Sequence, residues 1–383
     1  MTTTETTSQS WFSRLGNSIK NVFFGFIFII GSIILLFWNE GRAVKTDQSL
    51  KEGAAAVVSV SAESTDPANE GKLIHFSGEA RTPSILTDTD FGVGGSALKL
   101  RRIVETYQWE EDTKSDTKEK LGGGTETTTT YSYSQDWSDA IIDSSGFKES
   151  QTHQNPKSKK YENKNFIAQN VSIGSYVIPD DLLESLSGFQ PFTITQEMLN
   201  SLPYAMQEKL ELIGNMIYVQ TGDTTAPQVG DTRVRYEIIT PQPLSIISKQ
   251  SQSTLTPYTT KNGRTISMIQ LGSKSAKEMF EGAVAANNVM TWVLRLVGTI
   301  LMYAGLRMVF GVLPIVAAVI PFFGRVVGAG MSVVSGLLTI IGASITIAVA
   351  WIVYRPLIGI ALLAVSALGV GLLIRMALRS SSK

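Results

Sequence analysis

The feature that most constrains the fold is an apolar run at 21–38, which ends directly at Asn39, Glu40, Gly41 and Arg42. A stretch of about 18 apolar residues is long enough to cross the hydrocarbon core of a bilayer as a helix. The run starts too far along the chain for a typical signal peptide, and no small-x-small cleavage site follows it. We therefore expect a retained transmembrane helix at 21–38.

Apolar sequence returns near Val289 and continues almost to the last residue. We expect three further spans, from Met290 to Gly311, from Gly328 to Val353 and from Leu357 to Ile374. The triplet Tyr354-Arg355-Pro356 separates the last two, because Arg355 is charged and Pro356 suits the first turn of a new helix. The sequence thus predicts four membrane helices.

The bias of Lys and Arg near the spans predicts the orientation, since cytoplasmic loops are enriched in positive charge. Arg14 and Lys20 precede the first span, and Arg379 and Lys383 follow the last. The predicted organisation is a cytoplasmic tail at 1–20, transmembrane helix 21–38, an extracytoplasmic domain at 39–289, a three-helix region at 290–374 with an interfacial or re-entrant segment near 312–323, and a cytoplasmic tail at 375–383.

Two arginines lie inside the second predicted span. Arg295 and Arg307 are separated by eleven uncharged residues, about 17 Å of helix. They either snorkel to opposite membrane surfaces or line a polar cavity inside the bundle.

Small residues are dense in the C-terminal helices, where Gly324 and Gly328 have GxxxG spacing and Gly336 follows. Small residues let helices approach closely in lipid. The pattern predicts either packing within one bundle or a homo-oligomer.

The composition of the chain narrows the functional classes. The formal net charge is zero, which gives no electrostatic attraction to nucleic acid, and the chain has no cysteine. His75 and His153 lie in unlike contexts and form no metal-binding pair. The acidic cluster Glu110-Glu111-Asp112 is typical of a solvated charge run. We predict no catalytic residue, no metal and no cofactor.

The extracytoplasmic domain alternates in short β-type patterns, so the fold class is an α+β membrane protein with a β-rich domain. In 99–110, the face with Ile103, Tyr107 and Trp109 is expected to be the apolar one. With 125–137, this run predicts a long hairpin with a flexible, solvated tip at Gly122–Gly124. Further strands are expected at 72–79, 232–240, 244–254 and 265–271, and helices at 179–187, 195–212 and 275–288.

Several blocks of residues together resemble the LUMA, or transmembrane protein 43, family. These blocks are Asn39 to Thr46, Asn69 to His75, Leu100 to Trp109, Tyr131 to Trp137, His153 with Asn155-Pro156, Val229-Gly230-Asp231, and Trp351 with Tyr354-Arg355-Pro356. Their order and spacing carry the resemblance over nearly the whole chain. The structural motif residues are accordingly Asn39, Glu40, Gly41, Arg42, Trp109, Trp137, Gly230, Asp231, Tyr354, Arg355 and Pro356.

The resemblance implies a four-span protein with a large non-cytoplasmic domain and no established enzymatic activity. It implies self-association and the organisation of membrane protein complexes, in the endoplasmic reticulum or inner nuclear membrane of eukaryotes. We expect a bacterial member in the inner membrane, with lipid and further copies of itself as partners. Two rival hypotheses are a ligand- or ion-handling protein with a cavity near Arg295 and Arg307, and a membrane hydrolase using Glu40 or Glu105.

Overall fold

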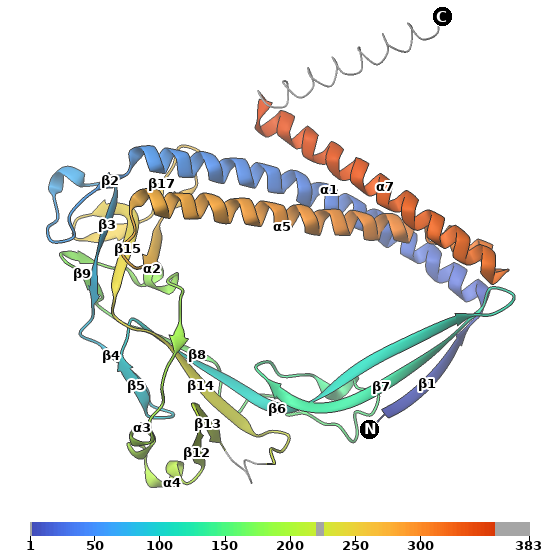
Figure 1. Cartoon of the computed structure of the whole chain (residues 1–383), viewed down its shortest axis with the longest axis horizontal. Helices are drawn as coiled ribbons and strands as arrows, with labels where there is room; N and C mark the ends of the chain where they lie inside the picture. Colours follow the sequence, from blue (N-terminus) through green and yellow to red (C-terminus); the bar gives the residue numbers. More distant parts are fainter. Residues whose placement is uncertain (1, 220–225, 357–383) are drawn as a thin grey trace, which may run out of the picture. The chain divides into compact units, whose positions relative to one another are not determined.

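The structure is a computed structural model, and it describes residues 2–219 and 226–356. The chain divides into two compact units. The β-rich unit comprises 1–5, 52–115 and 129–281, and the helical unit comprises 6–51, 116–128 and 282–383. Figure 1 shows the helices and strands of both.

Two large sheets form the β-rich unit. The eight-stranded sheet has the order β1-β7-β6-β14-β13-β12, with β11 and β8 added. Its strands are β1 (Thr2–Gln9), β6 (Lys99–Glu119), β7 (Thr125–Ser138), β8 (Lys164–Ile167), β11 (Gln190–Pro191), β12 (Leu210–Ile213), β13 (Met216–Val219) and β14 (Thr232–Ile239). The seven-stranded sheet has the order β10-β9-β3-β15-β16, with β2 and β19 added. Its strands are β2 (Val58–Ser59), β3 (Leu73–Arg81), β9 (Ser172–Ile173), β10 (Tyr176–Val177), β15 (Pro243–Ser251), β16 (Thr254–Thr256) and β19 (Met268–Leu271).

Smaller elements complete this unit. They are the β4–β5 pair (Ile85–Asp88, Val93–Ser96), the β17–β18 pair (Tyr258–Thr259, Thr265–Ile266), the 3₁₀ turns η1 (Pro67–Asn69) and η2 (Ser144–Gly146), and the helices α2 (Asp180–Glu184), α3 (Gln196–Asn200) and α4 (Tyr204–Gln207). A turn at Asn262-Gly263, with Gly263 at φ +82°, joins β17 to β18. The helix expected at 195–212 is partly wrong, because Leu210–Ile213 pairs with β13 as strand β12.

The predicted hairpin of β6 and β7 is confirmed, but the apolar face assigned to β6 is wrong. Leu100 and Val104 are fully buried, whereas Ile103, Tyr107 and Trp109 are half-buried. The buried face also carries polar residues, which concealed it in the sequence. Leu100 and Val104 lie opposite Ile238 and Val234 of β14 and pack in one of two hydrophobic clusters. The other cluster lies beside β3 and β15, where Phe76 stacks on Tyr176.

The helical unit is built from α1 (Trp11–Ala56), α5 (Ala276–Phe310), α6 (Val312–Ala317) and α7 (Pro321–Tyr354). α1 is one continuous helix, so it passes well beyond the predicted end at residue 38. Ser275 caps α5: the Glu278 backbone N–H donates to its hydroxyl, and its own N–H donates to the Glu278 carboxylate. α6 matches the first part of the predicted interfacial segment, whereas α7 begins earlier than the predicted span at Gly328.

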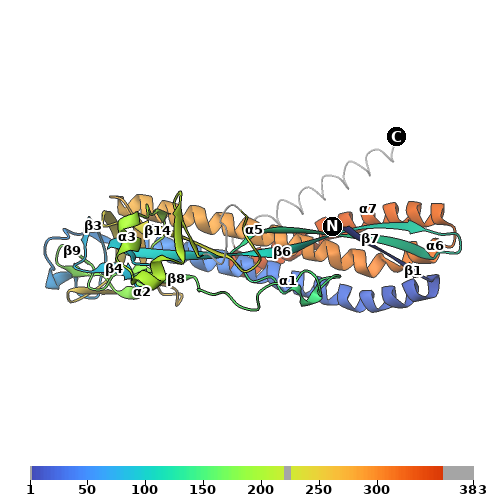
Figure 2. The same ribbon diagram turned by 90° about the horizontal axis from the view of Figure 1, so that it is seen from below.

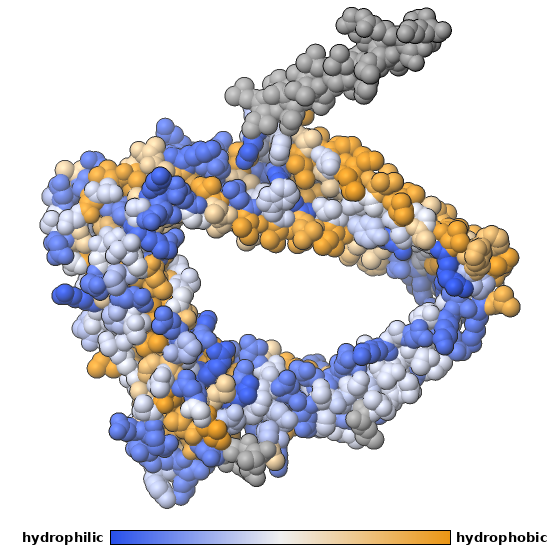
Figure 3. Space-filling view, viewed as in Figure 1, coloured by the Kyte–Doolittle hydropathy of each residue, from blue (hydrophilic) through white to orange (hydrophobic). Residues whose placement is uncertain are grey.

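Three helices of the described residues are long and apolar enough to cross a membrane, namely α1, α5 joined to α6, and α7. They lie side by side over part of their length in two perpendicular views (Figures 1 and 2). Their outward side chains are largely apolar (Figure 3). The span predicted at 357–374 lies outside the described residues.

The hairpin tip is not free in the structure, contrary to the predicted solvated tip. Gly123 lies against the Trp11 ring, and the Gly122 N–H donates to the Val319 carbonyl at 3.1 Å. Arg14 hydrogen-bonds the Gly123 carbonyl and forms an ion pair with Glu119 at 3.2 Å. Within the helical unit, the tip therefore contacts the start of α1.

Candidate functional site at the Asn39–Arg42 motif

Glu40 is a buried carboxylate that binds two other helices. Arg295 of α5 donates from Nε to Oε1 at 2.7 Å and from Nη2 to Oε2 at 2.9 Å. Trp351 of α7 donates from Nε1 to Oε2 at 2.8 Å. The Glu40 side chain is only 2% exposed. Because both of its oxygens accept from charged or indole N–H groups, one residue of α1 holds α5 and α7 together.

The ion-pair partner of Glu40 lies 255 residues away in the sequence. The structure pairs Glu40 with Arg295, whose guanidinium also lies 4.8 Å from the Trp292 ring centroid. The Arg295 side chain is 17% exposed, and its guanidinium points to Glu40.

Asn39 and Arg42 extend the network by one helical turn. The buried Asn39 amide donates to the Thr291 carbonyl at 3.0 Å, and Arg42 donates to the Asn39 amide oxygen. Arg42 also donates to the side chains of Asn287 and Thr291, each at 2.9 Å. Asn287 in turn donates to the Ala43 carbonyl at 3.1 Å. These bonds explain why polar residues follow the apolar run of α1 so abruptly.

Gly41 allows close contact with the end of α7. A Cβ at this position would stand 2.6 Å from the Tyr354 ring, so a larger residue would displace that ring. Tyr354 also packs on Phe37, with ring centroids 5.3 Å apart. At Arg355 the helix ends, with its N–H donating to the Trp351 carbonyl, and Pro356 follows. The two motifs recognised in the sequence are therefore neighbours.

α1 and α5 also approach closely at glycines that the sequence reasoning missed. A Cβ on Gly25 would lie 2.7 Å from the Gly305 carbonyl oxygen, and a Cβ on Gly305 equally close to the Gly25 oxygen. Gly298 leaves room for Leu36, which packs with Met302 in the small core of the helical unit. Gly298 and Gly305 are seven residues apart on one face of α5, a spacing that the sequence does show, but their partners on α1 are known only from the pairing of the helices.

The three glycines singled out on α7 have different environments. Gly324 packs on Ala318, and Gly328 faces Pro314 of α6. Gly336 meets nothing within 4 Å among the described residues. The buried stripe of α7 instead contains Ser335, Thr339, Ala343, Thr346 and Ala350 together with Gly324. Of the three, Gly324 and Gly328 thus lie at contacts within the chain.

The β-rich unit has a buried cluster of related chemistry. Arg102 donates to Asp88 and Asp90, each at 2.7 Å, and the Tyr236 hydroxyl donates to Asp88 at 2.6 Å. Burial disfavours the charge of Arg102, but the Asp90 hydrogen bond and the Asp88 charge outweigh it and raise the Arg102 pKa. Burial and the Asp88 charge raise the pKa of Tyr236. The sequence reasoning did not single out these residues.

Trp109 belongs to an aromatic cluster around His153. The His153 ring stacks on Tyr133 with centroids 3.9 Å apart, and the Trp109 ring meets its edge at 4.5 Å. Asn155 pairs with the Trp109 backbone, accepting from its N–H at 2.7 Å and donating to its carbonyl at 2.9 Å. Burial and a hydrogen bond to Glu111 raise the pKa of Tyr133 to about 12. The cluster therefore has a structural role, fixing the loop on β6.

The remaining motif residues close the end of β14. Gly230 has φ +100° and donates to the Tyr107 carbonyl, while the Asp231 carboxylate accepts from the Gln228 N–H at 2.8 Å. Trp137 packs on Tyr107 and lies under the Arg233 guanidinium at 4.6 Å. These residues form a turn and a packed sheet face.

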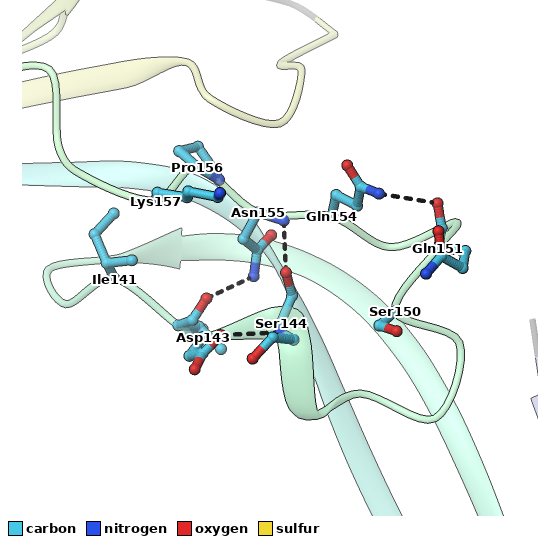
Figure 4. A pocket seen from close by; sticks show the side chains of 11 residues that line it. Ile141, Asp143, Ser144, Ser150, Gln151, Gln154, Asn155, Pro156 and Lys157 are labelled. Carbon is cyan, nitrogen blue, oxygen red and sulfur yellow. Dashed lines mark hydrogen bonds between the residues drawn. The ribbon is translucent and has the colours of Figure 1, made fainter.

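A surface hollow of about 790 Å³ lies at the loop that carries Asn155 (Figure 4). Its lining includes Asp143, Ser144 and Asn155. The Asp143 carboxylate accepts from the Ser145 N–H, and the Ser144 hydroxyl accepts from the Asn155 N–H. These polar groups serve the loop itself. Within the described ranges, no group of three or more His, Asp or Glu residues could hold a metal ion.

Comparison with known proteins agrees with the motifs. The sequence profile described as Transmembrane protein 43 matches residues 106–356. Transmembrane protein 43 of Rattus norvegicus is 32% identical over 90% of this chain and 87% of its own length. The human protein is 30% identical over 92% and 89%, and the Drosophila melanogaster homolog 32% identical over 90% and 91%. No solved structure matches the chain.

The profile covers more than half of the chain and includes Trp109, Trp137, Arg295 and Trp351. The relatives extend the similarity over nearly the whole length. Together with the three helices that are apolar and long enough to cross a membrane, this similarity identifies an integral membrane protein. The chain therefore belongs to the transmembrane protein 43 family.

Proposed function

We propose that the chain is a multi-pass membrane scaffold without catalytic activity of its own. In this proposal it self-associates and organises membrane protein complexes through its extracytoplasmic domain. The observation that carries the proposal is the position of Glu40, a buried carboxylate that accepts from Arg295 and Trp351. Such a contact fixes α1, α5 and α7 relative to one another, and the domain proposed to bind partners is the part of the chain between α1 and α5.

The rival functions receive less support from the same residues. The Arg295 guanidinium is engaged with Glu40, and Arg307 donates to the Gly328 carbonyl at 3.3 Å, so neither arginine points to an ion or ligand. For a hydrolase, two carboxylates should face each other across a cleft. Glu40 and Glu105 are instead each paired with an arginine, Glu105 with Arg233.

The membrane that holds the protein is also a proposal. We expect the bacterial inner membrane or, in a eukaryote, the endoplasmic reticulum or inner nuclear membrane. Fractionation of the native host with compartment markers tests this expectation, and recovery in any other membrane would contradict it.

The test of the scaffold is assembly in native lipid. The full chain is extracted from its own membrane in polymer nanodiscs and weighed by mass photometry. We expect two or more copies per disc, accompanied by other membrane proteins at a constant ratio. The Lys51→Ala variant, which removes an exposed pair with Asp47, is the control: it should give the same distribution of copies per disc as the wild type. Discs that hold single copies, with no companion at a constant ratio, would overturn the proposal.

A further inference from the structure

The N-terminal strand β1 lies on the outer edge of β7 in the eight-stranded sheet. Lys148 forms an ion pair with Glu5 at 2.9 Å, and the Tyr131 hydroxyl donates to the same carboxylate at 3.4 Å. At the other end of the strand, the Gln9 carbonyl lies at Gly124. β1 therefore runs toward the tip while β7 runs away from it, so the two strands are antiparallel.

This pairing conflicts with a membrane-spanning α1. β1 precedes α1 and β7 follows it, and α1 contains one apolar stretch long enough to cross a bilayer. A single crossing carries the two ends of a helix to opposite sides of the membrane. A chain whose α1 spans a bilayer therefore cannot pair its own Thr2–Gln9 with its own Thr125–Ser138.

The contacts of the hairpin tip are likewise incompatible with a membrane-spanning α1. Gly123 lies against Trp11, and Arg14 binds Glu119, so the tip meets residues that precede the apolar stretch of α1. A spanning α1 separates these groups as well. Insertion of α1 must therefore separate β1 from β7, and the hairpin tip from the start of α1.

Release of β1 leaves a long sheet edge unpaired. β7 has fourteen residues and no proline, and its charges are limited to Glu126 and Asp136. Proteins normally protect such an edge, because its free N–H and C=O groups are a template for another strand. The strand seated there, TTTETTSQ, shows that the edge accepts an extended segment rich in Thr and Ser.

The sequence of β7 itself, TETTTTYSYSQDWS, has this same chemistry. If two copies of β7 pair antiparallel about Ser132, Glu126 stands opposite Ser138, and Asp136 opposite Thr128. No like charges face each other in that register, and Tyr131 faces Tyr133. Two β7 edges are therefore chemically complementary.

We propose that the outer edge of β7 is a strand-acceptor site, which β1 occupies only while α1 lies outside a bilayer, and which pairs with the same edge of a second copy once α1 is inserted. The proposal rests on the proposed self-association and names its interface. β-Augmentation of this kind takes its affinity from main-chain hydrogen bonds.

Single cysteines test the interface, because the chain has no cysteine of its own. Ser132→Cys and, as an exposed control on β17, Thr259→Cys are placed in phosphatidylcholine–phosphatidylglycerol vesicles and mildly oxidised. We expect at least five-fold more disulfide dimer from Ser132→Cys. Thr128→Cys and Asp136→Cys should cross-link when mixed with each other and much less when each is alone.

A second pair of cysteines tests the exchange. Gln9→Cys with Gly124→Cys should form a disulfide within one chain in detergent, and this disulfide should be lost in vesicles. A disulfide of equal yield in vesicles would overturn the exchange. Equal cross-linking of Ser132→Cys and Thr259→Cys would overturn the β7 interface. If mass photometry still finds dimers in that case, the protein self-associates through another surface and the scaffold proposal survives. If it finds single copies, both proposals fail.

Discussion

Both units of the molecule bury an arginine against a carboxylate, with an aromatic donor on the same acid. In the β-rich unit, Asp88 binds Arg102, fourteen residues away, and Tyr236. In the helical unit, Glu40 binds Arg295, 255 residues away, and Trp351. The first cluster lies within strands that backbone hydrogen bonds already hold together. The second cluster joins helices, whose backbone hydrogen bonds run within each helix. The side chains of the second cluster therefore orient the helices relative to one another, which the backbone cannot do.

The largest effect is expected from Glu40→Ala. This change leaves the Arg295 guanidinium buried without its carboxylate, and breaking a buried pair in this way costs about 3–5 kcal/mol. Thermal unfolding in detergent, followed by tryptophan fluorescence, should show a clear fall in the transition temperature. Lys51→Ala should change stability by less than about 1 kcal/mol, since its pair is exposed. Equal stability of the two variants would show that the contact between Glu40 and Arg295 does not stabilise the protein.

The corresponding change in the β-rich unit is Asp88→Ala, with a smaller expected loss of about 2–4 kcal/mol. Asp90 still binds Arg102, and Arg102 also donates to the Glu162 carbonyl at 3.0 Å. Denaturant unfolding checks the value. Adding Asp90→Ala should increase the loss further, and a double variant no worse than Asp88→Ala would show that Asp90 compensates nothing.

Removing the aromatic donor from each cluster tests the same comparison of the two units, with a smaller expected loss of stability. Tyr236→Phe and Trp351→Phe each remove one hydrogen bond to a carboxylate, a loss of about 1.5–3 kcal/mol. Trp351→Phe should in addition loosen α7, because no backbone hydrogen bond joins helices. Cross-linking of α1 to α7 through introduced cysteines measures this loosening. Unchanged cross-linking would mean that Trp351 does not orient α7.

The smallest effect concerns alkaline pH and is confined to the β-rich unit. The pKa of Tyr133 is raised to about 12, from about 10 in an unfolded chain. Its contribution to stability is therefore complete below pH 10 and is lost as the pH rises from 10 through 12. The free energy of unfolding of the wild type should fall toward that of Tyr133→Phe across this range. Parallel pH profiles of the two proteins would contradict the assignment.

Much of this fold follows from sequence patterns. The apolar run of α1, the hairpin of β6 and β7 and the helix expected at 275–288 each depend on local patterns, and each is present. The buried face of β6 could not be predicted, because Arg102 and Gln108 occupy core positions and satisfy their polar groups in three dimensions. The partner of Glu40 could not be predicted either, since that pairing depends on how α1 and α5 align.

For the candidate site, the Asn39–Arg42 motif itself was visible because polar residues at the end of a span are costly without partners. The residues that the motif binds on α5 and α7 could not be predicted from the sequence. Gly305 does have a small residue at helical spacing, because Gly298 lies seven residues before it. That these two glycines face α1, and that Gly305 meets Gly25, depends on the pairing of two helices far apart in the sequence. Contact between helices distant in sequence leaves no periodic signal.

The reciprocal glycine contact has a mechanical consequence. α1 and α5 are in close contact at Gly25 and Gly305, and again at Glu40 and Arg295. Along α1 these points are fifteen residues apart, about 22 Å of helix. Two rods joined at one point can still change their crossing angle, whereas two rods joined at two such points cannot. Any side chain added at Gly25 therefore acts as a wedge with a long lever arm, and its displacement is felt at the ion pair four turns away.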